Sequence, residues 1–270
     1  MIFDAHMHVG DFGPMFNVSL DRDGLAEIIA EHGYEGCCVF HPDNEYVRTV
    51  VESIPEAYGL VWGNPRLPGY ADEVERFLEH PKFLGLKLHP LIDGYHPNDP
   101  AVHPLMKLLL ERGLPVLLHS GHPIFTLPWS IEELAVAFPG VKVIIGHMGH
   151  GNVVYINASI DIAARNPNVY LETSGMPMHT KIKDAVERVG VERVLYGSDA
   201  PFHHPAVEIL RVQVSGLGPE ELERVLSGNS RTLFLGQKSV GDGEVTSAPA
   251  GDNRGTESHD EKEEETWVDV

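Results

Sequence analysis

The sequence has few cysteines and no long hydrophobic run. Its only cysteines, Cys37 and Cys38, are adjacent, so they predict no disulfide framework and are typical of a reducing cytoplasm. No stretch is long and apolar enough to form a transmembrane helix, so we expect no membrane partner. The first residues lack a basic region followed by an apolar run, so we expect no signal peptide and a cytoplasmic location.

Basic residues are scarce as well. The sequence has 40 acidic and 20 basic residues and a formal net charge of −20, which repels a phosphate backbone and predicts no nucleic-acid partner. Residues 237–270 are rich in acidic residues and contain almost no large apolar side chains. Such a segment cannot bury enough apolar surface to offset its ordering entropy. We therefore predict a disordered acidic tail over 237–270 and one folded domain over 1–236.

Short apolar runs alternate with amphipathic stretches throughout residues 1–236. The runs predict eight strands, over residues 2–6, 36–41, 58–64, 84–89, 115–119, 141–147, 168–173 and 193–198. Their continuous apolar character is typical of parallel strands that are buried on both faces. Eight strand–helix alternations predict an α/β fold, the (β/α)8 TIM barrel. No Gly-x-Gly-x-x-Gly follows the first strand, which disfavours the alternative of a doubly wound open sheet.

Histidines gather at the ends of the predicted strands. His6 and His8 are two apart on the first strand, so their imidazoles share one face. Imidazole is the commonest protein ligand for transition metals. Most of the other strands also end in polar residues, namely His41, Asn64, His89, His119, His147 and Asp199. The carboxyl ends of barrel strands meet on one face, so this pattern predicts a metal site there.

Six segments follow one another in the order found in a known superfamily. They are DAHMH (4–8), GLKLHP (85–90), LHSG (118–121), IGHMG (145–149), YGSDAPF (196–202) and GNS (228–230). On this ordered set the chain resembles the amidohydrolase superfamily. It is most similar to the amidohydrolase-2 branch, which includes hydrolases and lyases of the aminocarboxymuconate-semialdehyde-decarboxylase type.

The resemblance implies one divalent metal, usually zinc, held by His6, His8, His119 and Asp199. It also implies that His147 polarises a water molecule or the substrate. The residue chemistry agrees with this assignment, because three neutral imidazoles and one carboxylate suit a borderline-soft cation and leave one position open. Asp199 and His147 are then the expected catalytic residues, Asp199 as proton acceptor and His147 as general base.

Three further residues are candidates for binding substrate or a second metal. Lys87 and His89 share a face at the end of the fourth strand, where binuclear amidohydrolases carry a carboxylated lysine. The amidohydrolase-2 branch commonly has a lysine here while using one metal, so we expect a mononuclear site. Arg66 is a candidate anchor for a substrate carboxylate, although it also fits a structural turn. Glu172, at the end of the seventh strand, is a candidate support for a metal ligand.

These residues lead us to expect a hydrolase that directs a metal-activated water at a small amide, ester or lactone. The alternative is a metal-dependent decarboxylase of an unsaturated or aromatic carboxylic acid, in which Arg66 and Lys87 would bind the carboxylate. A TatD-type nuclease is disfavoured by Lys87, because that group has a metal-binding glutamate on the fourth strand. A metal-binding scaffold without activity is disfavoured by the complete ligand set. A homodimer is the default expectation for the oligomeric state.

Overall fold

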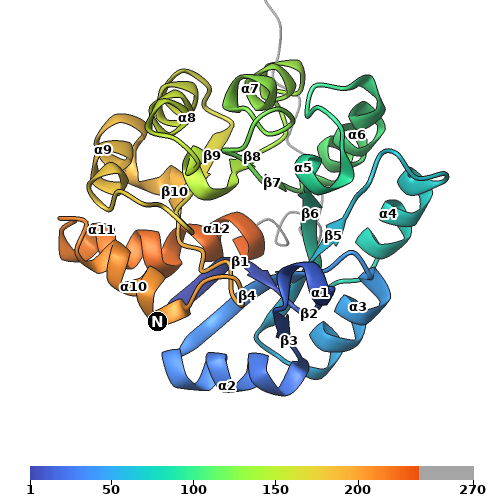
Figure 1. Ribbon diagram of the computed structural model, residues 1–270, viewed down its shortest axis with the longest axis horizontal. Helices are drawn as coiled ribbons and strands as arrows, with labels where there is room; N and C mark the ends of the chain where they lie inside the picture. The colour runs from blue at the N-terminus through green and yellow to red at the C-terminus, as the bar shows by residue number, and fades with distance from the viewer. Residues whose placement is uncertain (237–270) are drawn as a thin grey trace, which may run out of the picture. The chain divides into compact units, whose positions relative to one another are not determined.

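The predicted (β/α)8 barrel is confirmed by the structure, a computed structural model that describes residues 1–236 (Figure 1). Its eight parallel strands form one sheet in chain order: β1 (Ile2–His8), β4 (Tyr34–Phe40), β5 (Ala57–Trp62), β6 (Phe83–Leu88), β7 (Val116–Leu118), β8 (Val143–Ile145), β9 (Val169–Glu172) and β10 (Val194–Leu195). A small hairpin, β2 (Gly10–Asp11) with β3 (Ser19–Leu20), follows β1. The predicted tail lies outside the described residues.

Helices surround the strands, as Figure 1 shows. The α-helices are α1 (Gly13–Phe16), α2 (Arg22–His32), α3 (Asn44–Ser53), α4 (Tyr70–Leu78), α5 (Pro90–Asp93), α6 (His103–Arg112), α7 (Pro128–Ala137), α8 (Val153–Arg165), α9 (Thr180–Val189), α10 (Pro205–Gln213), α11 (Pro219–Glu223) and α12 (Asn229–Leu235). The 3-10 helices are η1 (Pro100–Val102), η2 (Gly146–Gly149) and η3 (Val191–Arg193), and η4 (Arg224–Gly228) is a π-helix. Polar side chains fix several helix starts: Asp21 accepts from the backbone N–H of Gly24, and Asn152 from that of Val154.

The barrel closes between β1 and the segment that follows β10. The backbone N–H of His8 donates to the carbonyl of Ala200 at 2.7 Å. The N–H of Asp199 donates to the carbonyl of His6, also at 2.7 Å. These bonds hold Asp199 beside the two histidines of β1, although nearly the whole barrel separates them in sequence.

The interior of the barrel is apolar at the amino ends of the strands. Phe3, near the start of β1, stacks on Phe234 of α12 with ring centroids 6.1 Å apart. Cys38 belongs to this inner apolar cluster, whereas Cys37 packs between the barrel and the helices. Both cysteines are free, as predicted, and lie on opposite faces of β4. The apolar end leaves the carboxyl ends of the strands to carry the polar residues.

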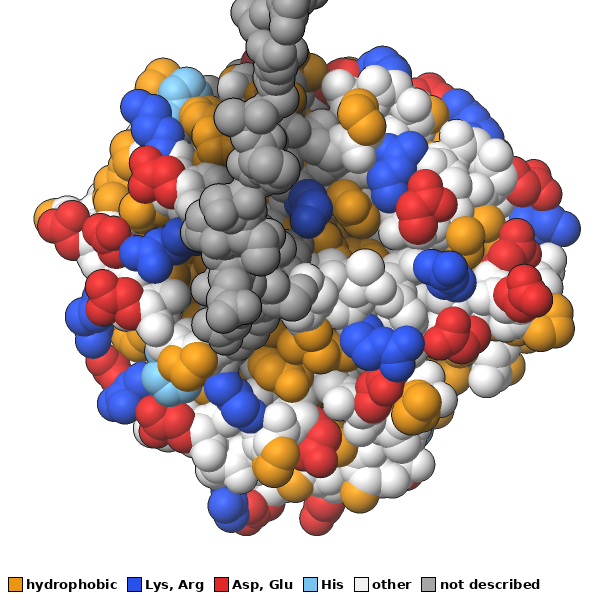
Figure 2. Space-filling model, turned by 180° about the vertical axis from the view of Figure 1, so that it is seen from behind, with side chains coloured by type: hydrophobic (Ala, Val, Ile, Leu, Met, Phe, Trp, Pro, Cys, Tyr) orange, Lys and Arg blue, Asp and Glu red, His pale blue; other side chains and the backbone are white. Residues whose placement is uncertain are grey.

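Figure 2 shows the face opposite to that of Figure 1. Where side chains are visible on this face, charges of both signs are interspersed. Several basic side chains pair with acidic ones, as Arg76 does with Glu45 at 2.8 Å. Such exposed pairs contribute little to stability. Within the described residues, no helix has the length and apolar character needed to cross a membrane.

Candidate metal centre

The closing seam of the barrel brings together three of the predicted metal ligands. Nε2 of His6 and Nε2 of His8 lie 3.3 and 3.1 Å from the same oxygen, Oδ1 of Asp199. The three residues each offer a ligand atom within 4.8 Å of the others; the side chains of the two histidines are buried, and that of Asp199 is partly exposed to the cavity. We call His6, His8 and Asp199 the inner group.

Asp199 reaches this position through an unusual backbone conformation. Its φ is +56°, in the left-handed region that L-residues other than Asn, Asp and Gly rarely enter. His147 and Met148 at the end of β8 also have positive φ values, +61° and +47°. Strained residues of this kind concentrate at functional sites. At both strand ends the chain therefore leaves the sheet sharply and turns a polar side chain toward the barrel axis.

The fourth predicted ligand, His119, lines the same cavity but has different nearest partners. Its Nδ1 lies 3.0 Å from Nε2 of His147, and its Nε2 lies 3.1 Å from Nδ1 of His122. Within the described residues, His119 groups by distance with His122 and His150 rather than with the inner group. The structure thus places three predicted ligands together and the fourth at the wall of the same cavity.

A buried carboxylate, Glu172, sets the direction of the hydrogen bonds around these histidines. Its Oε2 lies 2.6 Å from Nδ1 of His6 and accepts from the backbone N–H of His147 and from the hydroxyl of Ser174. When Glu172 is ionised, Nδ1 of His6 donates to it, which leaves the Nε2 lone pair facing Asp199. Burial raises the pKa of the Glu172 carboxyl to about 8, although these donors oppose the shift.

A chain of hydrogen bonds with the same donor-to-acceptor direction continues from Ser174 through His147 to His119. Because the Ser174 hydroxyl donates to Glu172, its oxygen accepts from Nδ1 of His147 at 2.9 Å. Nε2 of His147 then accepts from Nδ1 of His119, and Nε2 of His119 keeps a lone pair directed toward His122. Both nitrogens of His147 are thus occupied within the described residues.

Lys87 is fully buried next to the inner group. Its Nζ lies 3.1 Å from Nε2 of His6 and 4.5 Å from the centre of the Phe40 ring. Burial lowers the pKa of Lys87 to about 8, and the carboxylates of Asp199 and Glu172 oppose that shift. The lysine therefore competes for the nitrogen that a metal would use.

His89 lines the cavity, whereas Arg66 lies outside it. The His89 ring stacks between Trp62 and His119, with centroid distances of 5.5 and 4.1 Å, and lines the cavity. Arg66 is exposed, and its guanidinium donates to the carbonyl of Gly94 at 2.6 Å. Arg66 is not among the cavity-lining residues, so the structure agrees with the turn interpretation.

The cavity above the inner group is walled by aromatic rings that sequence reasoning missed. Its volume is about 280 Å³, and its walls include Phe12, Phe16 and Phe202. The Phe12 and Phe202 rings meet that of His8 at centroid distances of 5.0 and 4.9 Å. The only sequence signal for this wall is phenylalanine in the segments that follow the first and last strands.

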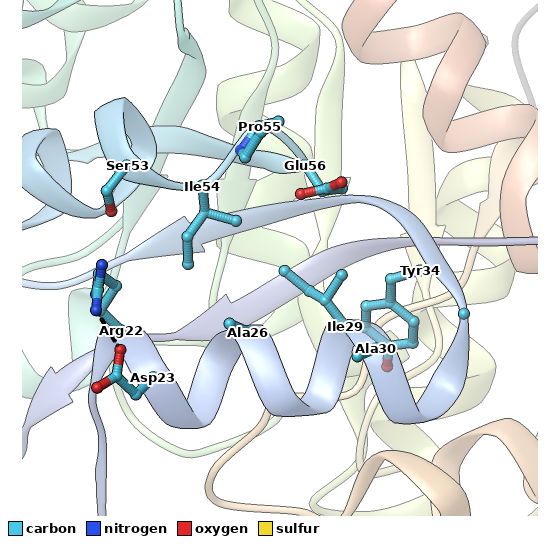
Figure 3. A pocket seen from close by; sticks show the side chains of 11 residues that line it. Arg22, Asp23, Ala26, Ile29, Ala30, Tyr34, Ser53, Ile54, Pro55 and Glu56 are labelled. Carbon is cyan, nitrogen blue, oxygen red and sulfur yellow. Dashed lines mark hydrogen bonds and ion pairs between the residues drawn. The ribbon is translucent and has the colours of Figure 1, made fainter.

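A larger cavity, of about 560 Å³, lies away from the histidines, against α2 (Figure 3). Ala26, Ile29 and Ile54 line it, and Arg22 pairs with Asp23 at one end. Within the described residues it brings no group of metal-ligating side chains together. The histidine-lined cavity is therefore the candidate site.

The inner group fits a divalent first-row metal. Burial holds the pKa values of the His6 and His8 imidazoles below their usual range, so both present neutral nitrogens. Two imidazoles and a carboxylate that converge on one point are a donor set that zinc sites use. His119 lies at the cavity wall as a further nitrogen donor.

Comparison with known protein families agrees with the motifs. The family model Amidohydro_2, described as amidohydrolase, matches residues 4–235. The chain belongs to the amidohydrolase-2 family. The predicted resemblance is confirmed.

Three bacterial relatives are γ-resorcylate decarboxylases. The protein of Polaromonas sp. (strain JS666 / ATCC BAA-500) is 26% identical over 114 residues, which cover 36% of this chain and 35% of the relative. That of Rhizobium radiobacter is 27% identical, covering 43% and 45%. That of Rhodococcus jostii (strain RHA1) is 25% identical over 260 residues, covering 82% and 68%. The matches thus span less than half of the length of the first two relatives.

Solved structures show the same fold. A dihydroxybenzoic acid decarboxylase from Polaromonas sp. JS666, with bound manganese and 2-nitroresorcinol, has a TM-score of 0.68 at 18% identity, covering 87% of this chain and 96% of that one. A 5-carboxyvanillate decarboxylase from Novosphingobium aromaticivorans, complexed with manganese and a nitrobenzoic acid, has a TM-score of 0.71 at 13% identity, with the same coverage.

Proposed function

We propose that the protein is a metal-dependent decarboxylase of a small aromatic carboxylic acid. The observation that carries this proposal is the inner group of metal ligands at the base of an aromatic-walled cavity. The γ-resorcylate decarboxylase relatives support it, and they favour the decarboxylase alternative over the hydrolase that we first expected.

The metal position is formed by His6, His8 and Asp199, with His119 as the fourth candidate ligand. A divalent cation held there would act as a Lewis acid that binds substrate oxygens and stabilises negative charge. Zinc stays our prediction from the family resemblance, while manganese is the metal of two structural neighbours. The proposal requires one divalent cation and does not depend on which of the two it is.

The remaining residues bind and orient the substrate. Phe12 and Phe202 cover the His8 ring, so they supply apolar faces against which a flat aromatic acid can pack. Arg66 is too exposed to hold the carboxylate inside the cavity, and Lys87 lies behind His6. A cation held by the inner group would therefore supply the charge that binds the carboxylate, with Lys87 adding positive charge from the interior.

Asp199 is the candidate for proton transfer, because its carboxyl lines the cavity and touches both histidines of β1. In the proposed reaction, the Asp199 carboxylate takes up a proton from solvent and would pass it to the ring carbon that bears the substrate carboxylate. The bond to the carboxylate then breaks, CO2 leaves, and the electron pair of that bond restores the aromatic ring. His147, expected as general base, has both nitrogens occupied. We propose that it acts through His119 as a positioning residue.

The test is a substrate panel with the metal-replete full-length protein. The panel contains hydroxybenzoic acids, including 2,6-dihydroxybenzoate, together with lactones and amides. We expect CO2 release from at least one aromatic acid, and its loss in Asp199→Ala. Hydrolysis of a lactone or amide without CO2 release from any acid would overturn the proposal in favour of the hydrolase.

A further inference from the structure

A second group of histidines stands at the rim of the cavity. His119 follows β7, His122 lies three residues further along the same loop, and His150 follows η2. One ring nitrogen from each lies within 4.8 Å of the other two. We call His119, His122 and His150 the outer group. It contains no carboxylate and shares only His119 with the predicted ligand set.

Nε2 of His119 and Nδ1 of His122 are hydrogen-bonded to each other at 3.1 Å, a bond that a cation between them would replace. Nε2 of His119 carries the lone pair that the hydrogen-bond direction from Glu172 requires, and it faces Nδ1 of His122. Nε2 of His150 is buried and has no hydrogen-bond partner among the described residues. A buried nitrogen without a partner is costly, and a bound metal would remove that cost.

The other nitrogen of His150 is already held by the backbone. The ring forms a hydrogen bond with the backbone of Gly175, and Gly175 leaves room for it, since an added Cβ would lie 2.9 Å from Nδ1. The His150 ring also stacks on that of His147, with centroids 4.5 Å apart. Metal-binding histidines characteristically use one nitrogen for the metal and fix the other by such a bond.

Close packing of two loops brings the outer group together. Gly121 has a φ of +99°, and a Cβ there would lie 2.8 Å from the carbonyl carbon of Gly149 and 2.9 Å from the Gly151 nitrogen. The loops after β7 and β8 therefore meet backbone to backbone. The hydroxyl of Ser120 strengthens the contact by accepting from the Gly149 N–H at 3.0 Å.

We propose that the outer group is a second binding site for a first-row transition metal, beside the inner group. Three neutral imidazoles favour Zn²⁺, Co²⁺, Ni²⁺ or Cu²⁺ over Mg²⁺ and Ca²⁺, which prefer oxygen ligands. The two sites are coupled, because His119 can direct its Nε2 lone pair at only one of them. The outer site thus holds its metal through His119, and the inner site then relies on His6, His8 and Asp199.

The experiment counts metal ions on the full-length protein. The protein is stripped with a chelator, equilibrated with Co²⁺, freed of unbound metal by gel filtration, and analysed for cobalt and for visible absorption. We expect two Co²⁺ per wild-type chain. The double variant His122→Ala/His150→Ala and the variant Asp199→Asn should each retain one. The variant His96→Ala, which removes an exposed histidine outside both groups, should retain two.

One Co²⁺ on the wild-type chain would overturn the proposal, and so would two on the double variant. The wild-type count needs no substitution, so a variant that fails to fold does not leave the question open. Cu²⁺ bound to Asp199→Asn gives a second readout, because the outer group should show imidazole nitrogen couplings in its electron paramagnetic resonance spectrum. The metal count is independent of turnover: two Co²⁺ without CO2 release would overturn only the proposed function.

Discussion

Glu172 holds His6 by a hydrogen bond of 2.6 Å between two fully buried side chains. The same carboxylate accepts from the backbone N–H groups of His147 and Ser174. One residue of β9 therefore fixes the ring of a candidate ligand on β1 and the turn that follows β8. Glu172 also accepts a hydrogen bond from the Ser174 hydroxyl. Through Ser174 and His147, this bond determines which nitrogen of His119 carries the lone pair.

Replacing this carboxylate by an amide should weaken metal binding without emptying the space. In Glu172→Gln the side chain keeps its size, but it no longer requires Nδ1 of His6 to donate, so the Nε2 lone pair is less well directed. Loss of such a supporting partner typically costs about 10–100-fold in metal affinity. Competitive titration of the stripped protein with Zn²⁺ and a chromophoric chelator measures the change.

The matched control is Glu79→Gln, which makes the same change at an exposed position. It should keep wild-type metal affinity. Equal affinities for Glu172→Gln and wild type, with both proteins folded by circular dichroism, would show that Glu172 does not orient the metal ligands.

The sequence predicted the barrel because each buried strand is a continuous apolar run. It was less accurate about where strands end: residues 141–147 and 193–198 were predicted, whereas the ladder contains only Val143–Ile145 and Val194–Leu195. The difference has a local cause. The backbone enters the left-handed region at His147 and Asp199, where the chain turns toward the site. The sheet hydrogen-bonding pattern ends before these turns. Apolar runs carry no signal for that turn.

The candidate site was predictable only where strand spacing decides it. The alternation of side chains places His6 and His8 on one face, so that pairing follows from sequence. The aromatic wall does not follow from the sequence, because Phe12 and Phe202 lie in loops that are far apart in the sequence and meet only in the folded barrel. The position of Arg66 also depends on a distant residue, Gly94, whose carbonyl binds the guanidinium outside the cavity.

Removing the Asp199 carboxylate should abolish turnover. Asp199→Ala loses both a metal ligand and the candidate proton donor, and loss of proton transfer alone typically costs about 10²–10⁴-fold in rate. Metal content after gel filtration should also fall, while circular dichroism should show an intact barrel. Full activity with undiminished metal content in this variant would remove Asp199 from the site.

Removing the Lys87 ammonium should strengthen metal binding. Its Nζ lies 3.1 Å from the His6 nitrogen that faces Asp199, so it both competes for that lone pair and repels a cation. In Lys87→Met we expect metal affinity to rise by at least about tenfold, measured by the same competitive titration. Lys107→Met, which removes an exposed lysine on α6, should leave affinity unchanged. Weaker binding in Lys87→Met would instead indicate that the lysine is part of the metal site.

Asp93 should make stability depend on pH. Burial raises the pKa of its carboxyl from 3.8 to about 6, against the hydrogen bond from the Trp62 indole. The native state therefore binds this proton more tightly than the unfolded chain, so ionisation of Asp93 lowers the free energy of unfolding as the pH rises from about 4 to about 6. Asp93→Asn removes that loss. The variant should gain stability relative to wild type over this interval in urea denaturation, and a difference that is constant with pH would contradict the assignment.

The aromatic wall should contribute to substrate binding more than to the chemical step. The Phe202 ring meets the rings of His8, Phe12 and Phe16, and it lines the cavity above the inner group. An aromatic contact contributes about 0.5–1.5 kcal/mol, which corresponds to a change of about 2- to 12-fold. Phe202→Ala should therefore raise KM for an aromatic acid by about that factor, with a smaller change in kcat. The KM of Phe202→Leu should lie between those of wild type and Phe202→Ala. Phe125→Ala, which removes a ring outside the cavity lining, should have the KM of wild type. If KM were unchanged in Phe202→Ala while kcat fell, the ring would act on the arrangement of His8 rather than on the substrate.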